Sequence, residues 1–381
     1  MSMFFSEAAW CCLAVTAALG SIVLCKHKSP GQLGTPVVWL AGLCGGAYLL
    51  VLPFFWSVTL FSLSCFLVHM YSADQELLPV DQKAVLVTGC DSGFGHALAK
   101  NLDKMGFTVF AGVLNEKSSG AEALRSNCSK RITVLQMDIT DPEQIKDAYS
   151  KVVEKVQDKG LWALVNNAGI LGFPTDGELI PMIEYKRCME VNFFGPIGVT
   201  KAFLPLLRKS KGRLVNVSSM GGGVPLPKMA AYNSTKAALT MFSSIMRQEL
   251  SAWGVKVSVV QPGGFQTSLA GTNDVWIKKE KDILDHLTQE QLRDYGQDYI
   301  LLQKNFLPLI GSKSCPDFTP VLQDIQHAIS AQSPFPFYTP GRMVSIWLYF
   351  AFLCPTYLLD YCVGKLLFNR KYVPRALRVP K

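Results

Sequence analysis

Ala84-Val-Leu-Val-Thr88-Gly-Cys-Asp-Ser-Gly93-Phe-Gly95 is the stretch of this 381-residue sequence that decides the fold. Its apolar start predicts a buried strand that ends at Thr88, and a helical pattern follows from His96 to Met105. The glycines between them permit a tight turn and a close approach of the backbone to a pyrophosphate, whose charge a helix N-terminus favours. The stretch predicts the opening strand, turn and helix of a dinucleotide-binding domain, although a plain strand-to-helix turn is the alternative.

Five more β-branched runs follow this strand, with helical patterns between them. They cover Thr108–Val113, Thr133–Met137, Ala163–Asn166, Arg213–Ser218 and Lys256–Gln261. Strands that alternate with helices predict an α/β fold with a doubly wound parallel sheet of the Rossmann type. Because ligands of such sheets bind beyond the carboxyl ends of the strands, the residues after each run are candidate site residues.

Candidate cofactor-binding residues follow the first, third and fourth strands. They are Thr88, Gly89, Asp91, Ser92, Gly93, Phe94, Gly95, Asp138, Asn166, Ala168 and Gly169. Asp138 could accept a hydrogen bond from an adenine amino group, or it could instead cap the next helix together with Thr140. The small residues of Asn166-Asn-Ala-Gly169 would let the backbone approach a ribose.

The end of the second strand bears on the choice of cofactor. NAD enzymes often place an acid there for the ribose, and NADP enzymes an arginine for the 2′-phosphate. Val113-Leu-Asn115 offers neither residue, and the glycine turn contains Asp91 but no base. A 2′-phosphate would have no obvious partner, so the sequence favours NAD over NADP.

Chemistry is expected after the fifth strand, where Ser219 is followed by Tyr232 and Lys236. Residues four apart lie on one face of a helix, one turn from each other. A free tyrosine is a poor base at neutral pH, with a pKa of about 10. An adjacent ammonium favours the phenolate and lowers that pKa, so Tyr232 could take the proton of an alcohol. Ser219 could bind the same oxygen, although a surface pair on an ordinary helix is the alternative for Tyr232 and Lys236.

Taken as a set, these motifs resemble the short-chain dehydrogenase/reductase family over about Lys83 to Leu269. The resemblance implies that Ser219 orients the substrate oxygen, that Tyr232 is the general acid/base, and that Lys236 lowers its pKa and binds the nicotinamide ribose. It also implies a fourth catalytic residue, Asn192, which supports a proton relay through water. The loop with Pro262, Gly263, Phe265 and Thr267 resembles the part that binds the nicotinamide carboxamide. Pairing of relatives through helices implies a possible homodimer by analogy.

Further stretches resemble the membrane-bound 17-beta-hydroxysteroid dehydrogenases of this family. They are Met1–Ser6, Gln75–Gln82, Phe110–Glu116, Gly172–Glu178 and Pro374–Arg378. This likeness implies NAD-dependent oxidation of estradiol, testosterone and some 20-alpha-hydroxysteroids at the endoplasmic reticulum membrane. Retinol or another lipid alcohol is the alternative substrate. A membrane scaffold without turnover is a remote alternative, because Asn192, Ser219, Tyr232 and Lys236 are all present.

The apolar segments predict a membrane anchor. Residues 8–25 are apolar and precede Lys26, which favours a retained signal-anchor helix over a cleaved signal peptide. Residues 36–70 contain one ionisable group, His69, and could cross the membrane once or twice, so the side that the catalytic domain faces stays open. We expect an anchor region at 1–73, a catalytic domain at 74–270 and a substrate-covering, membrane-associating extension at 271–381.

The extension has two features of its own. Its aromatic residues could line an apolar pocket or form a core: Trp276, Tyr295, Tyr299, Phe306, Phe335, Phe337 and Tyr338. Residues 346–368 form an apolar stretch interrupted by Pro355, which predicts a membrane-dipping or substrate-covering element.

Charge and cysteine usage exclude other classes of function. The net charge is +8, but the basic residues are scattered, and only the tail after residue 364 is purely basic, which suits an anionic membrane rather than nucleic acid. The 11 cysteines contain no CxxC pair, which argues against a disulfide framework and against a metal site.

Overall fold

The computed structural model describes residues 77–267, 269, 273–302, 314–367 and 373–378. They belong to a compact unit that runs from Leu77 to Lys381. The segments predicted to anchor the chain, 8–25 and 36–70, lie outside the described residues, and so does the predicted boundary at residue 73. Within the described ranges, no helix combines the length and the apolar character that crossing a bilayer requires.

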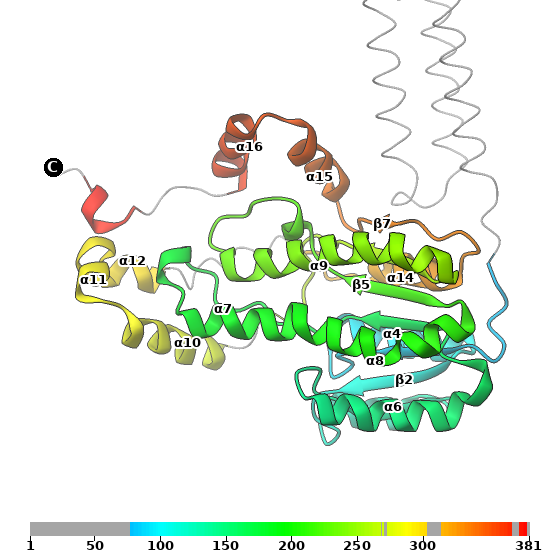
Figure 1. Cartoon of the computed structure of the whole chain (residues 1–381). Coiled ribbons are helices and arrows are strands. Elements are labelled where there is room, and N and C mark those ends of the chain that lie inside the picture. The colour runs from blue at the N-terminus through cyan, green and yellow to red at the C-terminus, as the bar shows by residue number, and fades with distance from the viewer. Residues whose placement is uncertain (1–76, 268, 270–272, 303–313, 368–372, 379–381) are drawn as a thin grey trace, which may run out of the picture. The chain divides into compact units, whose positions relative to one another are not determined.

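A parallel sheet of seven strands forms the centre of this unit, in the order β3-β2-β1-β4-β5-β6-β7 (Figure 1). The strands cover Ala84–Val87 (β1), Thr108–Val113 (β2), Ile132–Gln136 (β3), Ala163–Asn166 (β4), Arg213–Val217 (β5), Lys256–Val260 (β6) and Phe337–Tyr338 (β7). The six predicted strands are confirmed, each with its ends within one residue of the prediction. Strand order reverses between β1 and β4, which places a ligand site at the carboxyl ends of these strands.

The seventh strand corrects the expectation of six. In β7, Phe337 and Tyr338 pair with Val259 and Val260 of β6. A strand of two residues has no readable alternation, and the prolines of Pro334-Phe-Pro336 hide it further. Part of the segment expected to be a substrate cover therefore completes the sheet, and Tyr338 is a core residue.

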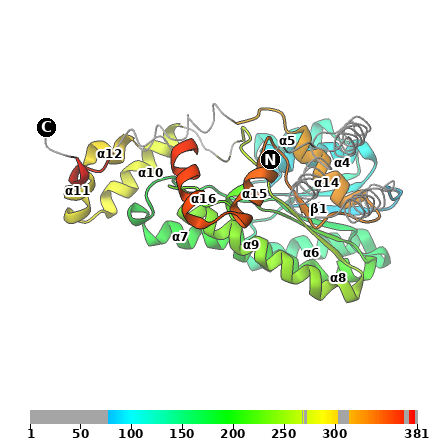
Figure 2. The same ribbon diagram turned by 90° about the horizontal axis from the view of Figure 1, so that it is seen from above.

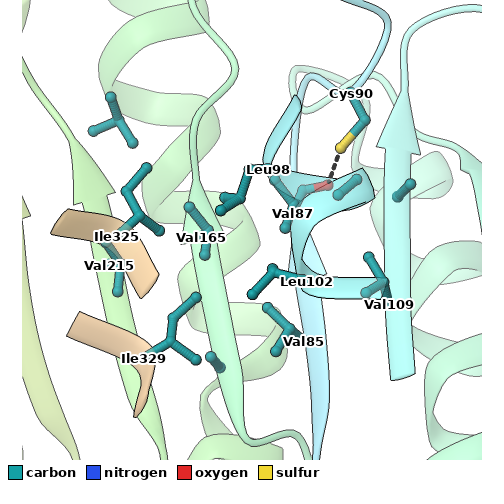
Figure 3. Close-up of a cluster of buried hydrophobic side chains, with 14 of the residues drawn as sticks. Val85, Val87, Cys90, Leu98, Leu102, Val109, Val165, Val215, Ile325 and Ile329 are labelled. Atoms are coloured by element: carbon teal, nitrogen blue, oxygen red, sulfur yellow. Dashed lines mark hydrogen bonds between the residues drawn. The ribbon is translucent and has the colours of Figure 1, made fainter. Parts of the chain in front are cut away.

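Helices cover both faces of the sheet. One face carries α4 (Gly93–Met105), α5 (Ser119–Asn127) and α14 (Thr319–Ser330); the other carries α6 (Pro142–Val156), α8 (Gly195–Ser210) and α9 (Ala230–Glu249). Figure 3 shows the first face, where Leu98 and Leu102 of α4 meet Val85 of β1. Ile325 and Ile329 of α14 extend the same cluster over β4 and β5. Strands buried on both faces need apolar residues at every position, which explains their unbroken hydrophobic runs.

The remaining helices lie beyond the sheet. α7 (Met182–Met189) continues through a π-helical turn, η3 (Glu190–Phe194), into α8. Both views place α10 (Asn273–His286), α11 (Gln289–Tyr295) and α12 (Gln297–Leu302) next to α7 (Figures 1 and 2). α15 (Val344–Leu353) and α16 (Thr356–Cys362) form a hairpin that packs against the segment from Met220 to Leu226. Short turns complete the described part: η1 (Gln157–Lys159), η2 (Gly177–Leu179), η4 (Met220–Gly222), η5 (Leu250–Trp253), η8 (Val363–Leu367) and η9 (Arg375–Leu377).

Candidate active site

A cavity of about 980 Å³ lies at the carboxyl ends of the strands, with walls from the loops after β1 to β6. Its size is that of a site for a cofactor with a small substrate. Fifteen of the predicted site residues line it: Gly89, Asp91, Ser92, Gly93, Phe94, Asp138, Ala168, Gly169, Ser219, Tyr232, Lys236, Pro262, Gly263, Phe265 and Thr267. We call the part formed after β1, β2 and β3 the cofactor wall, and the part formed by Ile170 and Leu171, in the loop after β4, the substrate wall.

The glycine turn of the cofactor wall has the backbone that a pyrophosphate site needs. Gly93, at the start of α4, has φ 58, a left-handed conformation that favours glycine. The first turn of α4 contains no acidic residue. A Cβ on Gly89 would lie 2.8 Å from the Cα of Ala168, so the loops after β1 and β4 touch at this glycine. The backbone can therefore approach a bound phosphate closely at the positive end of a helix.

Three residues predicted to bind the cofactor do not face the cavity. Thr88 is buried, and its hydroxyl accepts hydrogen bonds from the backbone N–H groups of Asn167 and Ala168, both at 3.0 Å. Gly95 packs against the carbonyl of Gly89. Asn166 donates to Thr200 at 2.9 Å and to Asn216 at 2.8 Å. These residues hold neighbouring loops together behind the wall, which a strand-end position in a sequence cannot distinguish from a direct contact.

Asp91 takes a position that the sequence did not reveal. Its carboxylate accepts hydrogen bonds from the backbone N–H groups of Leu114, at 2.8 Å, and Asn115, at 3.2 Å. The acid that is missing after β2 is thus supplied to the same place by the loop after β1. It leaves a negative charge on the cofactor wall at the end of β2.

Asp138 lines the cavity without capping a helix. Its Oδ1 accepts from the backbone N–H of Thr140 at 2.9 Å and from its hydroxyl at 2.8 Å. The N-cap of α6 is Asp141, whose side chain accepts from the N–H groups of Glu143 and Gln144. The alternative of an Asp138 cap is therefore wrong, and the residue instead shapes a local turn.

Ser219, Tyr232 and Lys236 meet in one corner of the cavity. Tyr232 and Lys236 lie one turn apart on α9, and the Lys236 Nζ is 5.7 Å from the centre of the tyrosine ring. Lys236 also donates to the carbonyl of Val217 at 3.0 Å, which fixes its direction. Ser219 hydrogen-bonds the Tyr232 hydroxyl. The three side chains converge as the sequence predicted.

Burial has the largest effect on the pKa values of Tyr232 and Lys236. It raises the pKa of Tyr232 to about 12, and the Ser219 hydrogen bond opposes that rise only in part. It lowers the pKa of Lys236 to about 8, because water cannot solvate the ammonium. In the protein alone, desolvation therefore raises the pKa of Tyr232, contrary to the predicted lowering. Lys236 is still mainly protonated at neutral pH, so it favours the phenolate whenever that forms.

Asn192 lies behind the substrate wall in the π-helical turn η3 and is fully buried. Its amide exchanges two hydrogen bonds with the backbone of Ile170, accepting from the N–H and donating to the carbonyl, both at 2.8 Å. It also donates to Thr235 of α9 at 3.1 Å. Asn192 therefore positions the substrate wall relative to α9, while its role in a proton relay stays a prediction.

The loop after β6 closes the cavity. The carbonyl of Pro262 accepts from the N–H of Met220 at 2.9 Å, and the N–H of Gly263 donates to Pro340 at 3.0 Å. Phe265 packs edge-on against Phe94 of the glycine turn, with ring centres 5.6 Å apart. The loops after β1 and β6 therefore meet, as expected if both enclose one ligand.

Several cavity residues were not predicted. They are mostly apolar: Leu114, Met137, Ile139, Thr140, Asn167, Ile170, Leu171, Arg187, Glu190, Val191, Val217, Ser218 and Leu269. Many of these residues directly follow a strand or a predicted motif. Their position after a strand was therefore the sequence signal that could have identified them. Arg187 and Glu190 come from α7 and η3, and no local pattern marks them.

Comparisons with known proteins agree with this geometry. The family model described as short chain dehydrogenase matches residues 83–278. The chain is 63% identical over 381 residues to human 17-beta-hydroxysteroid dehydrogenase type 2, covering all of this chain and 98% of that protein. It is 44% identical over 307 residues to bovine 11-beta-hydroxysteroid dehydrogenase type 2, covering 80% and 76%. Among solved structures, a short-chain dehydrogenase from Streptomyces avermitilis matches with a TM-score of 0.56 and 25% identity, over 75% of this chain and 94% of that one.

Proposed function

The chain belongs to the short-chain dehydrogenase family, and from this premise we propose that it oxidises the 17-beta hydroxyl of steroids such as estradiol and testosterone with NAD. The observation that carries the proposal is the 63% identity over the whole chain to a relative named for that activity. The converging Ser219, Tyr232 and Lys236 supply the groups that the chemistry needs.

The substrate wall suits a flat apolar molecule. Ile170 and Leu171 after β4, with Leu269 after β6, give an apolar lining to the cavity that also contains Tyr232. A pocket with a mainly apolar lining and a few convergent polar groups binds an apolar ligand and fixes its orientation. A steroid alcohol would bury its rings there and present its hydroxyl to Ser219 and Tyr232. A 20-alpha-hydroxysteroid is a further substrate of the same chemistry.

Proton transfer falls to Tyr232. Ser219 holds the substrate oxygen by a hydrogen bond, and Tyr232 in its phenolate form accepts the proton of the alcohol. Lys236, one turn away, stabilises that phenolate by its charge. A nicotinamide dinucleotide held by the cofactor wall would supply the acceptor for the hydride of the carbinol carbon. Tyr232 and Lys236 are buried, and their shielding from water strengthens each of these interactions.

The cofactor wall favours NAD over NADP. Asp91 places its carboxylate at the end of β2, where the additional phosphate of NADP would be recognised. Two basic residues line the cavity in the described part of the chain, Arg187 and Lys236. Neither belongs to the cofactor wall, because Arg187 lies on α7 and Lys236 on α9. At the end of β2, a 2′-phosphate would meet a like charge and no cation among the described residues that line the cavity. Because oxidised NAD dominates in cells, an NAD enzyme would run toward the ketone.

The proposal includes attachment to the endoplasmic reticulum membrane through an N-terminal signal-anchor helix, supported by the composition of residues 8–25. The hairpin of α15 and α16 supports a second contact with lipid. α15 carries no charged residue, and Phe352 at its end is 85% exposed. A helix of ten residues is too short to span a bilayer, so it would lie in the interface. Resistance of the protein to extraction from membranes by alkaline carbonate would test attachment.

A homodimer also belongs to the proposal, by analogy with family members. The exposed apolar residues Phe194, Met241 and Ile245 support it, because they lie on η3 and α9, outside the cavity. Cross-linking of the detergent-solubilised protein would show a dimer, and a monomer at all concentrations would contradict it.

Initial rates with membranes that contain the full chain test the enzymatic proposal. We expect estradiol to be oxidised with NAD at a kcat/KM at least about tenfold above that with NADP, and above the value for all-trans-retinol with either cofactor. A preference for NADP would contradict the oxidative assignment. A preference for retinol would replace the steroid by another lipid alcohol while leaving Tyr232 in its role.

A further inference from the structure

Three polar side chains from distant parts of the chain meet beside the substrate wall. Asp176 belongs to the loop after β4, Lys228 precedes α9, and Tyr299 lies on α12. The Lys228 ammonium is 3.1 Å from the Asp176 carboxylate and donates to the Tyr299 hydroxyl at 3.1 Å. That hydroxyl donates to the same carboxylate oxygen at 2.7 Å. Each member therefore contacts both others, and the phenol both donates and accepts.

The ion pair of this triad is better shielded from solvent than the pair of Lys146 and Glu143, which joins two residues of one helix. The side chains of Lys228 and Asp176 are 20% and 31% exposed, whereas those of Lys146 and Glu143 are 74% and 80% exposed. Exposed pairs contribute little, while partly buried hydrogen bonds to charged groups are among the strong ones. Lys228 has φ 66, a conformation that costs free energy in a lysine. Its side-chain contacts offset that cost.

An apolar contact lies next to the triad. Phe173 and Leu179, from the loop after β4, pack with Ile283 of α10 and with Ile300 of α12, and all four are buried. Tyr295 of α11 adds an exposed hydrogen bond to Glu178 at 2.8 Å. The segment from Ile283 to Ile300 is thus docked on this loop by an apolar core and by the triad.

The same loop carries the substrate wall. Ile170 and Leu171 line the cavity, and Phe173 begins the docked contact two residues later. Asn192 fixes the start of the loop at Ile170, and Asp176 fixes its far part. A shift at Asp176 would therefore move the apolar surface on which the substrate rests.

We propose that Asp176, Lys228 and Tyr299 form a latch that holds α10 to α12 on the loop after β4. By holding this loop, the latch sets the affinity for the substrate. The inference rests on the proposed function only for the choice of estradiol as the probe. None of the three lines the cavity, so they are positioning residues. The latch holds the loop after β4, whereas the cofactor wall is formed after β1, β2 and β3, so the latch should leave cofactor affinity unchanged.

Tyr299→Phe tests the latch with the smallest change, because the ring that packs against Ile300 and Phe173 is kept. We expect the KM for estradiol to rise about tenfold, because the variant loses a hydrogen bond to a charged group. The kcat should stay within about twofold and the KM for NAD should not change. Tyr149→Phe is the matched control, since it removes the hydroxyl of a half-buried tyrosine on α6 that packs edge-on against Phe203 and does not line the cavity. It should leave both KM values unchanged.

Substitution of the cation adds a rescue. Lys228→Met should raise the KM for estradiol like Tyr299→Phe, while Lys228→Arg should restore most of the affinity because it keeps the charge. The double variant Tyr299→Phe/Lys228→Met should be little worse than either single one, since each opens the same closed triad. Additive losses, or an equal rise in the KM for NAD, would overturn the latch.

Limited proteolysis of the full chain without substrate gives a readout that does not depend on the reaction. Cleavage between residues 283 and 302 should be at least about tenfold faster in Tyr299→Phe than in the wild type or in Tyr149→Phe, because undocking exposes the segment. Equal cleavage rates would overturn the latch. If the wild type failed to oxidise estradiol, the proposed function would fall, and these cleavage rates would still decide on the latch.

Discussion

The cofactor wall and the substrate wall differ in the part of the chain that supplies their polar supports. In the cofactor wall, Asp91 supports Leu114, 23 residues away, and Gln136 donates to the carbonyl of the same residue at 2.6 Å. In the substrate wall, Asp176 is held by Lys228 and by Tyr299, which is 123 residues away. The polar supports of the cofactor wall come from the strands of the sheet and the loops after them, while the substrate wall also depends on the folded C-terminal segment. A family can thus keep one wall and vary the other.

Tyr232→Phe should have the largest effect, because Tyr232 serves both walls at the point where they meet. Removal of the hydroxyl leaves no group to take the proton, and general acid–base catalysis contributes about 100- to 10,000-fold. We expect kcat to fall about 1,000-fold while binding of NAD, measured by protein fluorescence quenching, is kept. A variant with undiminished kcat would remove Tyr232 from its role.

Asn192→Ala should come next and act on the substrate wall alone. It deletes the two hydrogen bonds to Ile170 and leaves that buried N–H and carbonyl without partners. We expect kcat/KM for estradiol to fall about 100-fold, with a lower melting temperature and little change in the KM for NAD. An equal loss of NAD affinity would show that the two walls are not independent.

Asp91→Asn should act on the cofactor wall alone. The amide keeps the size of the side chain but loses the negative charge beside Leu114 and Asn115. We expect the ratio of kcat/KM with NAD to that with NADP to fall about tenfold, while the KM for estradiol stays the same. Steady-state kinetics with each cofactor would measure it, and an unchanged ratio would mean that Asp91 does not select NAD.

The smallest expected effect is a change in the pH dependence of stability in Lys236→Met. This variant also loses activity. Burial lowers the pKa of Lys236 to about 8, against about 10.5 when it is unfolded. Between pH 8 and 10 the unfolded chain therefore binds the proton that the native state has released, so the free energy of unfolding rises with pH. We expect this rise in the wild type and a flatter profile in the variant, with a higher melting temperature for the variant at pH 7. The same slope in both proteins would contradict the burial of the charge.

The sequence was sufficient for the parts that local patterns determine. Ala84–Gly95 specified a strand, turn and helix, and the spacing of Tyr232 and Lys236 placed both on one helical face. It could not show that Thr88 and Asn166 face away from the cavity, since a strand-end residue can point either way. Nor could it show β7, whose two residues join the sheet only through β6. The latch was equally hidden, because no pattern links Asp176 to Tyr299 before the chain folds.

Oxidation of estradiol that carries deuterium at C17 tests the central claim most directly. If Tyr232 removes the hydroxyl proton while the hydride leaves that carbon, the wild type should produce estrone together with NADH that contains the deuterium, and the Tyr232→Phe variant should produce neither at a comparable rate. Estrone formed without deuterium in NADH, or formed as fast by the variant, would contradict the account.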